Sequence, residues 1–250
     1  MPSARNNGRP QEQRKTLDRV LSRAGLMSRS QAQAAIAAGR VRVNGLRVRD
    51  PQSWVDLRSD RVEVDDAPLA AAAKLYLAFH KPVGYVTTRS DERGRASVYE
   101  LLGELDQWVA PVGRLDLDTS GLLLFTNDSD WAERITNPRS RMFKRYECLA
   151  AGSLDDAQLE RLRAGVELDD GPTAPARVRR LGASGADTRV EVAICEGRNR
   201  QVRRMFEALG SRVIELARVA IGPLELGSLA PGAQRKLKPF EIRALAGEPV

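Results

Sequence analysis

Two carboxylates lie two residues apart in a polar loop: Asp116 and Asp118 in the sequence GRLDLDTSG at residues 113–121. The apolar run LLLF at residues 122–125 follows, so the loop leads into a predicted buried strand, where a rigid scaffold can hold reactive groups. This spacing is compatible with acid–base catalysis, with a metal site of the Asp-x-Asp type, or with hydrogen bonds that only cap the loop. From the residues alone, capping is the simplest interpretation.

A second candidate is the arginine-rich sequence EGRNRQVRRMFEALG at residues 196–210. Its apolar residues recur at helical spacing: Val202, Phe206 and Leu209. Asn199 is expected to cap the start of this helix and Gly210 to end it, which leaves four arginines on the exposed first turns. By itself, this pattern is compatible with a solvated helix face that carries an Arg203–Glu207 pair.

Composition limits the class of protein. The chain has 250 residues, of which 42% are hydrophobic, so it can bury a substantial core. Lys and Arg exceed Asp and Glu by 40 to 33, a net charge of +7, which favours a polyanionic partner over a merely basic soluble protein.

Cys148 and Cys195 form no CxxC pair and are expected to be reduced, with neither a disulfide framework nor a zinc site. No apolar run approaches the ~20 residues of a membrane span, so we expect a cytoplasmic protein without membrane contact.

The N-terminal quarter has a helix and hairpin pattern. Residues 1–15 are expected to form a disordered basic tail, and two short helices should follow, the second opened by a capping box at Ser28–Gln31. Asn44-Gly45, between alternating runs, predicts a two-residue hairpin turn. That turn would place Arg42 opposite Arg47 and Arg40 opposite Arg49.

Like charges opposed across strands destabilise a hairpin unless they are solvated or neutralised by phosphates. We favour a nucleic-acid surface, because other basic residues nearby have almost no acidic neighbours in the sequence: Arg14, Lys15, Arg19, Arg23 and Arg29. The predicted RNA-binding residues of this part are Arg19, Arg23, Arg29, Arg40, Arg42, Arg47 and Arg49.

Two helices followed by a hairpin with a VNG turn resemble the S4-type RNA-binding domain, over residues 16–64. The resemblance implies that RNA is bound by shape and backbone charge. Residues 65–74 would then be a linker, in which an alanine run could also form a short helix.

From residue 75 onward, strand-like and helix-like segments alternate. The expected strands are 75–79, 85–88, 122–125, 145–150 and 189–194, and the expected helices are 130–136, 155–164 and 199–209. We predict an α+β chain, in which the small S4-like module precedes a mixed catalytic domain at residues 75–245 with a largely antiparallel sheet.

The sequence GRLDLDTSGLLLFTND at residues 113–128 resembles the catalytic signature of bacterial ribosomal RNA pseudouridine synthases, in their S4-containing small-subunit and large-subunit branch. HKPVGYVTT at residues 80–88 is similar to the strand and turn that open the catalytic domain of that family. The resemblance implies that Asp116 is the catalytic carboxylate.

The same resemblance implies roles for further residues. Arg114 would occupy the space left by the flipped nucleotide, Tyr146 would stack on the target base, and Leu216 would pack beneath it. The element containing Arg203 is similar to one in which a basic residue pairs with the catalytic aspartate and holds it ionised and oriented. The remaining arginines of that element are predicted to bind RNA: Arg198, Arg200 and Arg204.

The implied reaction converts uridine into pseudouridine, for which the base must leave its stack. Asp116 would act as the nucleophile toward the sugar or as the base that removes its C2′ proton, and the sequence leaves both open. No metal and no organic cofactor is expected, and the protein is expected to act as a monomer on ribosomal RNA or a ribosome-assembly intermediate. Asn199-Arg200-Gln201 with Arg203 resembles the large-subunit branch, which favours 23S over 16S ribosomal RNA.

Three other functions compete with this one. A non-catalytic RNA-binding or ribosome-assembly protein would not need Asp116, Tyr146 and Arg203 together. A glycosyltransferase with a metal at Asp116 and Asp118 would need a nucleotide-binding strand–loop–helix unit, and none precedes them in the sequence. In a glycosidase the carboxylates must flank a bond at about 5 Å or more, and two residues of one loop are poorly placed for that.

Overall fold

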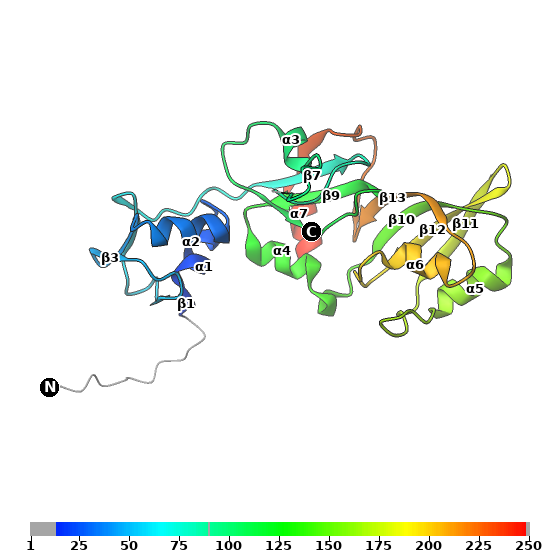
Figure 1. Cartoon of the computed structure of the whole chain (residues 1–250), viewed down its shortest axis with the longest axis horizontal. Helices are drawn as coiled ribbons and strands as arrows, with labels where there is room; N and C mark the ends of the chain where they lie inside the picture. The colour runs from blue at the N-terminus through cyan, green and yellow to red at the C-terminus, as the bar shows by residue number, and fades with distance from the viewer. Residues whose placement is uncertain (1–13, 90, 249–250) are drawn as a thin grey trace. The chain divides into compact units, whose positions relative to one another are not determined.

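The computed structural model describes residues 14–89 and 91–248, and the chain divides into two compact units (Figure 1). The N-terminal unit runs to Lys74 and includes Asp106–Val109, and the second unit comprises Leu75–Leu105 and the chain from Ala110 onward. Most of the predicted tail, residues 1–15, lies outside the described residues, but Lys15 is already part of a strand.

The N-terminal unit packs two helices against short strands. Its elements are β1 (Lys15–Thr16), α1 (Leu17–Arg23), α2 (Arg29–Ala37), β2 (Val41–Val43), β3 (Leu46–Val48), β4 (Trp54–Val55), β5 (Val62–Val64) and β6 (Ala67–Pro68). The capping box is confirmed, since the Ser28 side chain accepts from the Gln31 backbone and the Gln31 side chain accepts from the Ser28 backbone. Leu17, Leu21 and Ile36 are fully buried in its core.

The hairpin prediction is confirmed as well. Val41 pairs with Val48 and Arg42 with Arg47, and the turn residues Asn44 and Gly45 have φ of 53° and 80°. Such a turn requires positive φ at both positions, which Asn and Gly adopt at little cost. Within the expected linker, Ala67–Pro68 pairs with β5 as strand β6, which was not predicted. The alanine run that follows is not helical, so the alternative of a short helix there is wrong.

The second unit is built on one twisted sheet in which the strands follow the order β11-β12-β10-β13-β9-β7-β15. The strands are β7 (Tyr76–Lys81), β8 (Ala110–Val112), β9 (Ser120–Thr126), β10 (Lys144–Ala150), β11 (Arg177–Ser184), β12 (Asp187–Ile194), β13 (Val213–Ile221), β14 (Leu224–Glu225) and β15 (Gln234–Lys236). The pairs are antiparallel except β13 with β9, so the predicted α+β class and largely antiparallel sheet are confirmed. The strand expected at residues 85–88 is wrong, because that segment contributes only a bridge from Val86 to Ser97.

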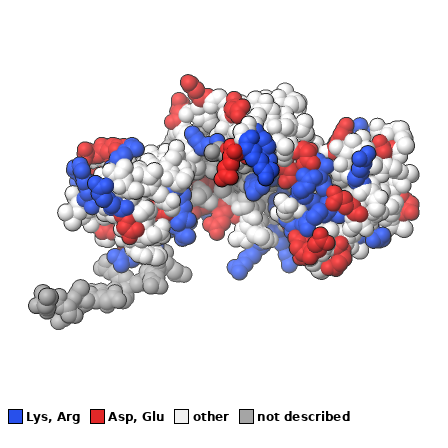
Figure 2. Space-filling model, viewed as in Figure 1, with Lys and Arg blue, Asp and Glu red and all other residues white. Residues whose placement is uncertain are grey.

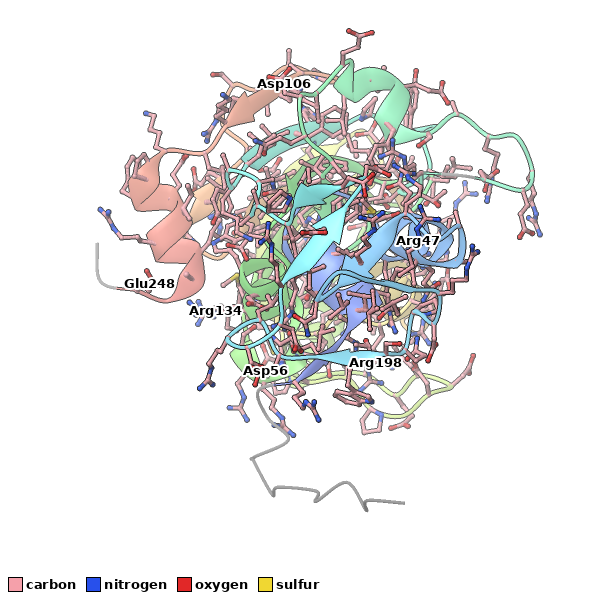
Figure 3. All side chains as sticks on the ribbon, turned by 90° about the vertical axis from the view of Figure 1, so that its left-hand side faces the viewer. Arg47, Asp56, Asp106, Arg134, Arg198 and Glu248 are labelled. Atoms are coloured by element: carbon pink, nitrogen blue, oxygen red, sulfur yellow. The ribbon has the colours of Figure 1, made fainter. Side chains whose placement is uncertain are left out.

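The helices of this unit are α3 (Val98–Leu102), α4 (Ser129–Thr136), α5 (Asp156–Ala164), α6 (Gln201–Glu207) and α7 (Pro239–Ala246), with a short 3-10 turn, η2 (Pro138–Ser140). One hydrophobic cluster joins α5 and α6 to β10, β12 and β13. A second cluster joins α4 and α7 to β7 and β9. At the edge of the second cluster, Arg134 and Glu248 form an ion pair at 3.0 Å (Figure 3).

The two halves of the sheet meet at the parallel contact between β9 and β13, which pairs Ser120 with Ala217 and Gly121 with Arg218. Gly121 has φ of 106°, and a Cβ built on it would lie 2.2 Å from the Arg218 backbone oxygen. Only glycine satisfies both conditions. The loop that carries Asp116 therefore enters the sheet at this close approach of the β9 and β13 backbones.

We expect Gly121→Ala to destabilise the protein by more than ~3 kcal/mol, because the added methyl group collides with backbone that cannot rotate away. Gly152→Ala is the matched control: Gly152 also has a positive φ, 79°, but nothing lies within 4 Å of its Cβ position. That variant should lose only about 1 kcal/mol. Urea unfolding measures both, and equal losses would contradict the importance of this close approach.

Candidate active site

A cleft of about 400 Å³ opens in the second unit, and the residues singled out in the synthase-like sequence meet there. Its walls come from the loop at residues 113–119, from β10, from the segment at residues 196–203 and from β13. Asp116, Arg114, Tyr146, Arg203 and Leu216 all line this cleft. Residues separated by 100 positions in the chain thus share one site because β10, β13 and β9 are neighbours in the sheet.

The segment at residues 80–88 fixes the loop that carries Asp116. The Thr87 hydroxyl donates to the Leu115 carbonyl at 2.8 Å, and the Gly84 amide donates to the Leu117 carbonyl at 2.8 Å. The loop also closes on itself through the Thr119 amide and the Asp116 carbonyl, at 3.1 Å. Asp116 is therefore held on a loop whose backbone is bonded on both sides.

Lys81 is the third and most buried support of this loop. Its side chain is fully buried, and its Nζ donates to the carbonyls of Thr119 at 2.7 Å, Pro82 at 3.0 Å and Leu117 at 3.5 Å. Burial lowers the pKa of Lys81 to about 8, although the charges of Asp116 and Asp118 act to raise it. No motif in the sequence singled out Lys81 as a site residue, and the available signal was a lysine at the end of the apolar strand LYLAFH.

Asp118 is clamped by two arginines. Arg200 donates to both of its carboxylate oxygens, at 3.0 and 3.1 Å, and the Nε of Arg203 lies 3.2 Å from Oδ2. Arg203 also donates to the Asp118 carbonyl at 2.7 Å and to the Val213 carbonyl at 3.0 Å. Partial burial acts to raise the pKa of Asp118, but the hydrogen bond from Arg200 and the charges of Arg203 and Arg200 outweigh it and lower that pKa.

This arrangement corrects the expected partner of Arg203, which pairs with Asp118 rather than Asp116. The cation nearest to the Asp116 carboxylate is Arg200, whose Nη1 is 4.0 Å from Oδ2. The difference arises because Arg203 is anchored in the core by the Val213 carbonyl, with only 6% of its surface exposed. Asp116 keeps 30% of its side chain exposed toward the cleft, so its carboxylate is accessible to a ligand.

Tyr146 and Leu216 supply the apolar part of the cleft. Tyr146 is half-buried and packs against the core cluster of β10, β12 and β13, and Leu216 is 6% exposed. Arg114 is exposed at the cleft, and no carboxylate among the described residues pairs with it. The cleft thus combines a carboxylate, an aromatic ring, an apolar surface and a long, exposed arginine side chain. This combination suits a planar base attached to a charged backbone.

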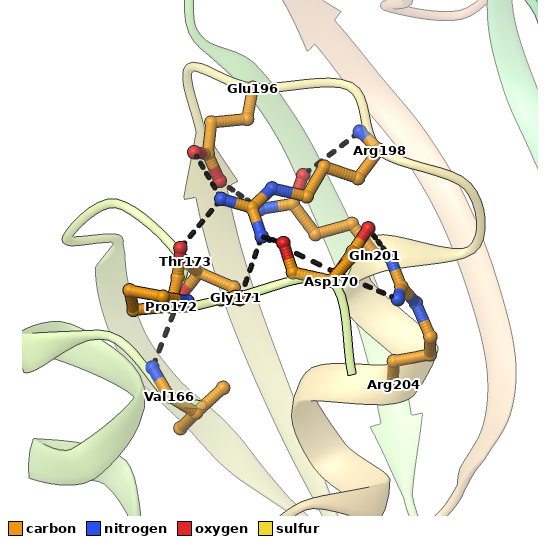
Figure 4. A network of polar contacts seen from close by, with 9 residues as sticks. All are labelled: Val166, Asp170, Gly171, Pro172, Thr173, Glu196, Arg198, Gln201 and Arg204. Atoms are coloured by element: carbon orange, nitrogen blue, oxygen red, sulfur yellow. Dashed lines mark hydrogen bonds and ion pairs between the residues drawn. The ribbon is translucent and has the colours of Figure 1, made fainter. Parts of the chain in front are cut away.

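Two of the arginines predicted to bind RNA are instead joined to a neighbouring loop (Figure 4). Arg204 makes a bidentate pair with Asp170, at 2.9 and 3.1 Å, and Arg198 donates to the Gly171 carbonyl at 2.7 Å and lies 3.4 Å from the Asp170 carboxylate. Glu196 accepts from Arg198 and from Gln201. These contacts tie the start of α6 to the loop at residues 166–173.

The start of α6 also differs from its prediction. The residue that precedes the helix is Arg200, with φ of 48°, and no side chain caps the helix there. Asn199, the expected cap, lies one residue earlier. Arg200 has the left-handed conformation, and its side chain donates to the Asp118 carboxylate.

In the N-terminal unit, several arginines have acidic partners that the sequence analysis did not anticipate. Arg40 makes a bidentate pair with Asp65, Arg42 pairs with Asp66 at 3.1 Å, and Arg29 pairs with the buried Asp18 at 2.7 Å. The expectation of a basic residue almost unopposed by acid is therefore wrong for Arg29, and Arg40 and Arg42, which were predicted to bind RNA, are paired as well. Basic and acidic side chains alternate over the face of this unit in Figure 2.

Among the residues that the structure describes, Arg19, Arg47 and Arg49 have no carboxylate within ion-pair distance. Arg19 and Arg47 are exposed, and Arg49 donates to the Ala37 carbonyl at 3.0 Å. Arg23 is half-buried. The cations available to a polyanion are thus fewer than the sequence suggested.

Within ranges 14–89 and 91–248, no three His, Cys, Asp or Glu side chains gather in a group able to hold a metal ion. No helix in the same ranges has both the length and the apolar character to cross a membrane.

Comparison with known families matches residues 75–208 to the family described as RNA pseudouridylate synthase, and residues 15–62 to the S4 domain. The chain is 41% identical over 231 residues to an uncharacterized RNA pseudouridine synthase of Aquifex aeolicus (strain VF5), covering 92% of each chain. It is 37% identical to ribosomal large subunit pseudouridine synthase B of Bacillus subtilis (strain 168), covering 92% of this chain and 94% of the relative.

A solved structure described as a pseudouridylate synthase has a TM-score of 0.67 and 32% identity to this chain, covering 92% of it and 99% of the other. An S4 domain followed by this catalytic domain defines an isomerase that acts on RNA. The chain belongs to the RNA pseudouridine synthase family.

We expect Lys81→Met to remove a pH dependence of stability. Between the folded pKa of about 8 and the ordinary value of 10.5, the unfolded chain binds more protons at Lys81 than the folded chain does. The folded state therefore gains stability as pH rises through this window, by up to about 3 kcal/mol. Urea unfolding below pH ~8 and above pH ~10 should show the gain in the wild-type protein and a smaller gain in Lys81→Met.

The control is Lys236→Met, at an exposed position of β15, which should keep the pH dependence of the wild-type protein. If Lys81→Met and the wild-type protein change equally with pH, the buried lysine does not titrate in this range.

Proposed function

We propose that this protein converts a specific uridine of 23S ribosomal RNA into pseudouridine, with Asp116 as the catalytic carboxylate. The name of the Bacillus subtilis relative, a large-subunit synthase, supports 23S over 16S ribosomal RNA as the substrate. Residues 16–64 act as the RNA-binding module, 65–74 as the linker and 75–245 as the catalytic domain. The enzyme acts as a cytoplasmic monomer.

The observation that carries this proposal is the different state of the two carboxylates in one loop. Asp118 is neutralised by Arg200 and Arg203, whereas Asp116 lies 4.0 Å from its nearest cation and is exposed to the cleft. A carboxylate that must attack a sugar or take a proton needs unoccupied oxygen lone pairs. Asp116 has them, in the same cleft as Tyr146 and Leu216.

The geometry suits a nucleotide that has left its helix. Tyr146 offers a ring face to the extruded base, and Leu216 offers an apolar surface next to it. Arg114, exposed at the cleft, reaches the phosphates or the space that the nucleotide vacates. Asp116 then attacks C1′ or removes the C2′ proton, which releases the base so that it can rotate and rejoin the sugar through C5.

The contacts of Asp118 argue against the hypothesis of a glycosyltransferase with a metal at Asp116 and Asp118. A metal held by Asp116 and Asp118 would have to displace a bidentate arginine from one of its two ligands. A non-catalytic RNA-binding protein would gain nothing from an accessible carboxylate in the same cleft as an aromatic ring.

We expect Asp116→Asn to lower turnover by on the order of 1,000-fold or more, because the amide keeps the shape but is neither nucleophile nor base. Asp118→Asn is the matched control and should lose only about tenfold, through looser placement of Arg200 and Arg203. Tritium release from 23S and 16S ribosomal RNA labelled at C5 of uridine measures both variants. Equal losses in the two variants would overturn the assignment of Asp116, and release from 16S alone would overturn the choice of subunit.

We expect Arg19→Ala/Arg47→Ala to weaken binding of ribosomal RNA without changing turnover at saturating RNA. These exposed side chains have no carboxylate partner among the described residues, so each can neutralise a phosphate. The log–log dependence of affinity on salt should become shallower by about 0.7 to 0.9 for each lost contact. Arg40→Ala is the control, because Arg40 is already paired with Asp65. A slope that changes equally in both variants, or in neither, would contradict this assignment.

A further inference from the structure

Two cations on the inner wall of the cleft, Lys144 and Arg218, have no part in the roles described so far. Both side chains line the cleft together with Asp116 and Tyr146. They come from adjacent strands, β10 and β13, at the centre of the sheet. None of the sequence motifs singled out Lys144 or Arg218 as a site residue.

Arg218 is almost completely buried, with 4% of its surface exposed. Its Nε donates to the Leu122 carbonyl at 2.7 Å, which fixes the guanidinium against β9. Its Nη2 is also buried and has no hydrogen-bond partner among the described residues. A buried donor without a partner costs free energy, so such a group calls for a functional explanation.

Lys144 is half-buried, and no carboxylate of the described chain pairs with it. Burial lowers the pKa of Lys144, and the positive charge of Arg218 lowers it further. Two acidic side chains line the cleft: Glu196 pairs with Arg198, and the Asp116 carboxylate lies 4.0 Å from Arg200. Among the described residues, therefore, no carboxylate forms an ion pair with either cation of this wall.

The register of the sheet places Lys144 and Arg218 next to Tyr146, the residue proposed to stack on the base. Arg218 pairs directly with Tyr146 across β10 and β13. Lys144 precedes Tyr146 by two residues, and Leu216 precedes Arg218 by two, so the members of each pair point to the same face of the sheet. One face thus presents an aromatic ring, an apolar side chain and two cations next to one another.

We propose that Arg218 and Lys144 bind the uracil ring through its electronegative atoms and stabilise the anion that it becomes when it is detached from the sugar. This inference rests on the proposed function. When the C1′–N1 bond breaks, its electron pair goes to N1 and spreads over O2 and O4, which gives a uracil anion. On the sugar, C1′ is now bonded to the Asp116 carboxylate, or it shares a double bond with C2′, whose proton Asp116 has taken. After rotation C5 bonds to C1′ while the Asp116–C1′ bond breaks, or while Asp116 returns the proton to C2′. The C5 proton is then lost, N1 gains a proton, and the product is an isomer of the substrate.

Uracil fits this wall better than a phosphate does. RNA phosphates are hydrated and lie along the outside of the chain, whereas Arg218 is 4% exposed at the inner wall. The base is neutral before cleavage and anionic after it, so fixed cations here bind the transition state more tightly than the substrate. They accelerate cleavage without strengthening RNA binding to the same degree.

The test uses the full-length protein and single-turnover cleavage of uridine in ribosomal RNA. We expect Arg218→Met to slow this step by about 100-fold and Lys144→Met by about 10-fold, with Arg218→Lys between the wild-type protein and Arg218→Met. Arg179→Met, which removes an exposed cation from β11 of the same sheet, is the control and should match the wild-type rate.

A second substrate separates charge stabilisation from a structural role. Fluorine at C5 withdraws electrons and stabilises the detached base by itself, so RNA with 5-fluorouridine at the target should be slowed less by Lys144→Met and Arg218→Met than RNA with uridine. Equal slowing of both substrates in the folded variants would overturn the inference. If Arg218→Met does not fold, Arg218→Lys and Lys144→Met carry the same comparison.

The salt dependence of RNA affinity distinguishes a phosphate site. We expect the same slope for Lys144→Met as for the wild-type protein, whereas loss of a phosphate contact would make the slope shallower by about 0.7 to 0.9 and overturn the assignment to uracil. If the wild-type protein turns over and the Lys144→Met and Arg218→Met variants react at the same rate, this inference alone is overturned. Absence of turnover in the wild-type protein would overturn the proposed function, and this inference with it.

Discussion

The site depends on the close parallel contact of β9 and β13. This contact pairs only Ser120 with Ala217 and Gly121 with Arg218, yet it joins the half of the sheet covered by α4 and α7 to the half covered by α5 and α6. The cleft lies along the same junction, because the loop before β9 carries Asp116 and β13 carries Leu216. A side chain at Gly121 would push these backbones apart, so the geometry of the site and the continuity of the sheet have one cause.

Buried positive charge is the second constraint on this region. Lys81, Arg203 and Arg218 are each at most 6% exposed, and each of them binds backbone carbonyls. Carbonyl oxygens compensate part of the cost of burying a cation and at the same time fix the strands and loops to which they belong. Arg203 and Arg218 also line the cleft, so their positive charge acts where the proposed reaction forms an anionic base.

The arginines of this chain differ in whether their guanidinium groups are already paired with a carboxylate. Arg198, Arg200 and Arg204 hold the loops around the cleft through Asp118 and Asp170, as Figure 4 shows for Arg198 and Arg204. In the N-terminal unit, Asp65 and Asp66 follow β5 in the chain, and their partners are Arg40 and Arg42. Counting arginines overestimates the RNA-binding surface, because a paired guanidinium must lose its carboxylate before it can bind a phosphate.

The sequence by itself determined the elements that have local signals: the capping box at Ser28, the Asn44-Gly45 hairpin and the apolar strand after residue 121. Hydrophobic spacing, turn chemistry and caps act within a few residues, so they can be read from the chain. The partners of Arg203, the burial of Lys81 and the pairing of Arg218 with Tyr146 join residues that lie tens of positions apart. Only the tertiary structure decided these, because ion pairing and burial depend on which strands become neighbours.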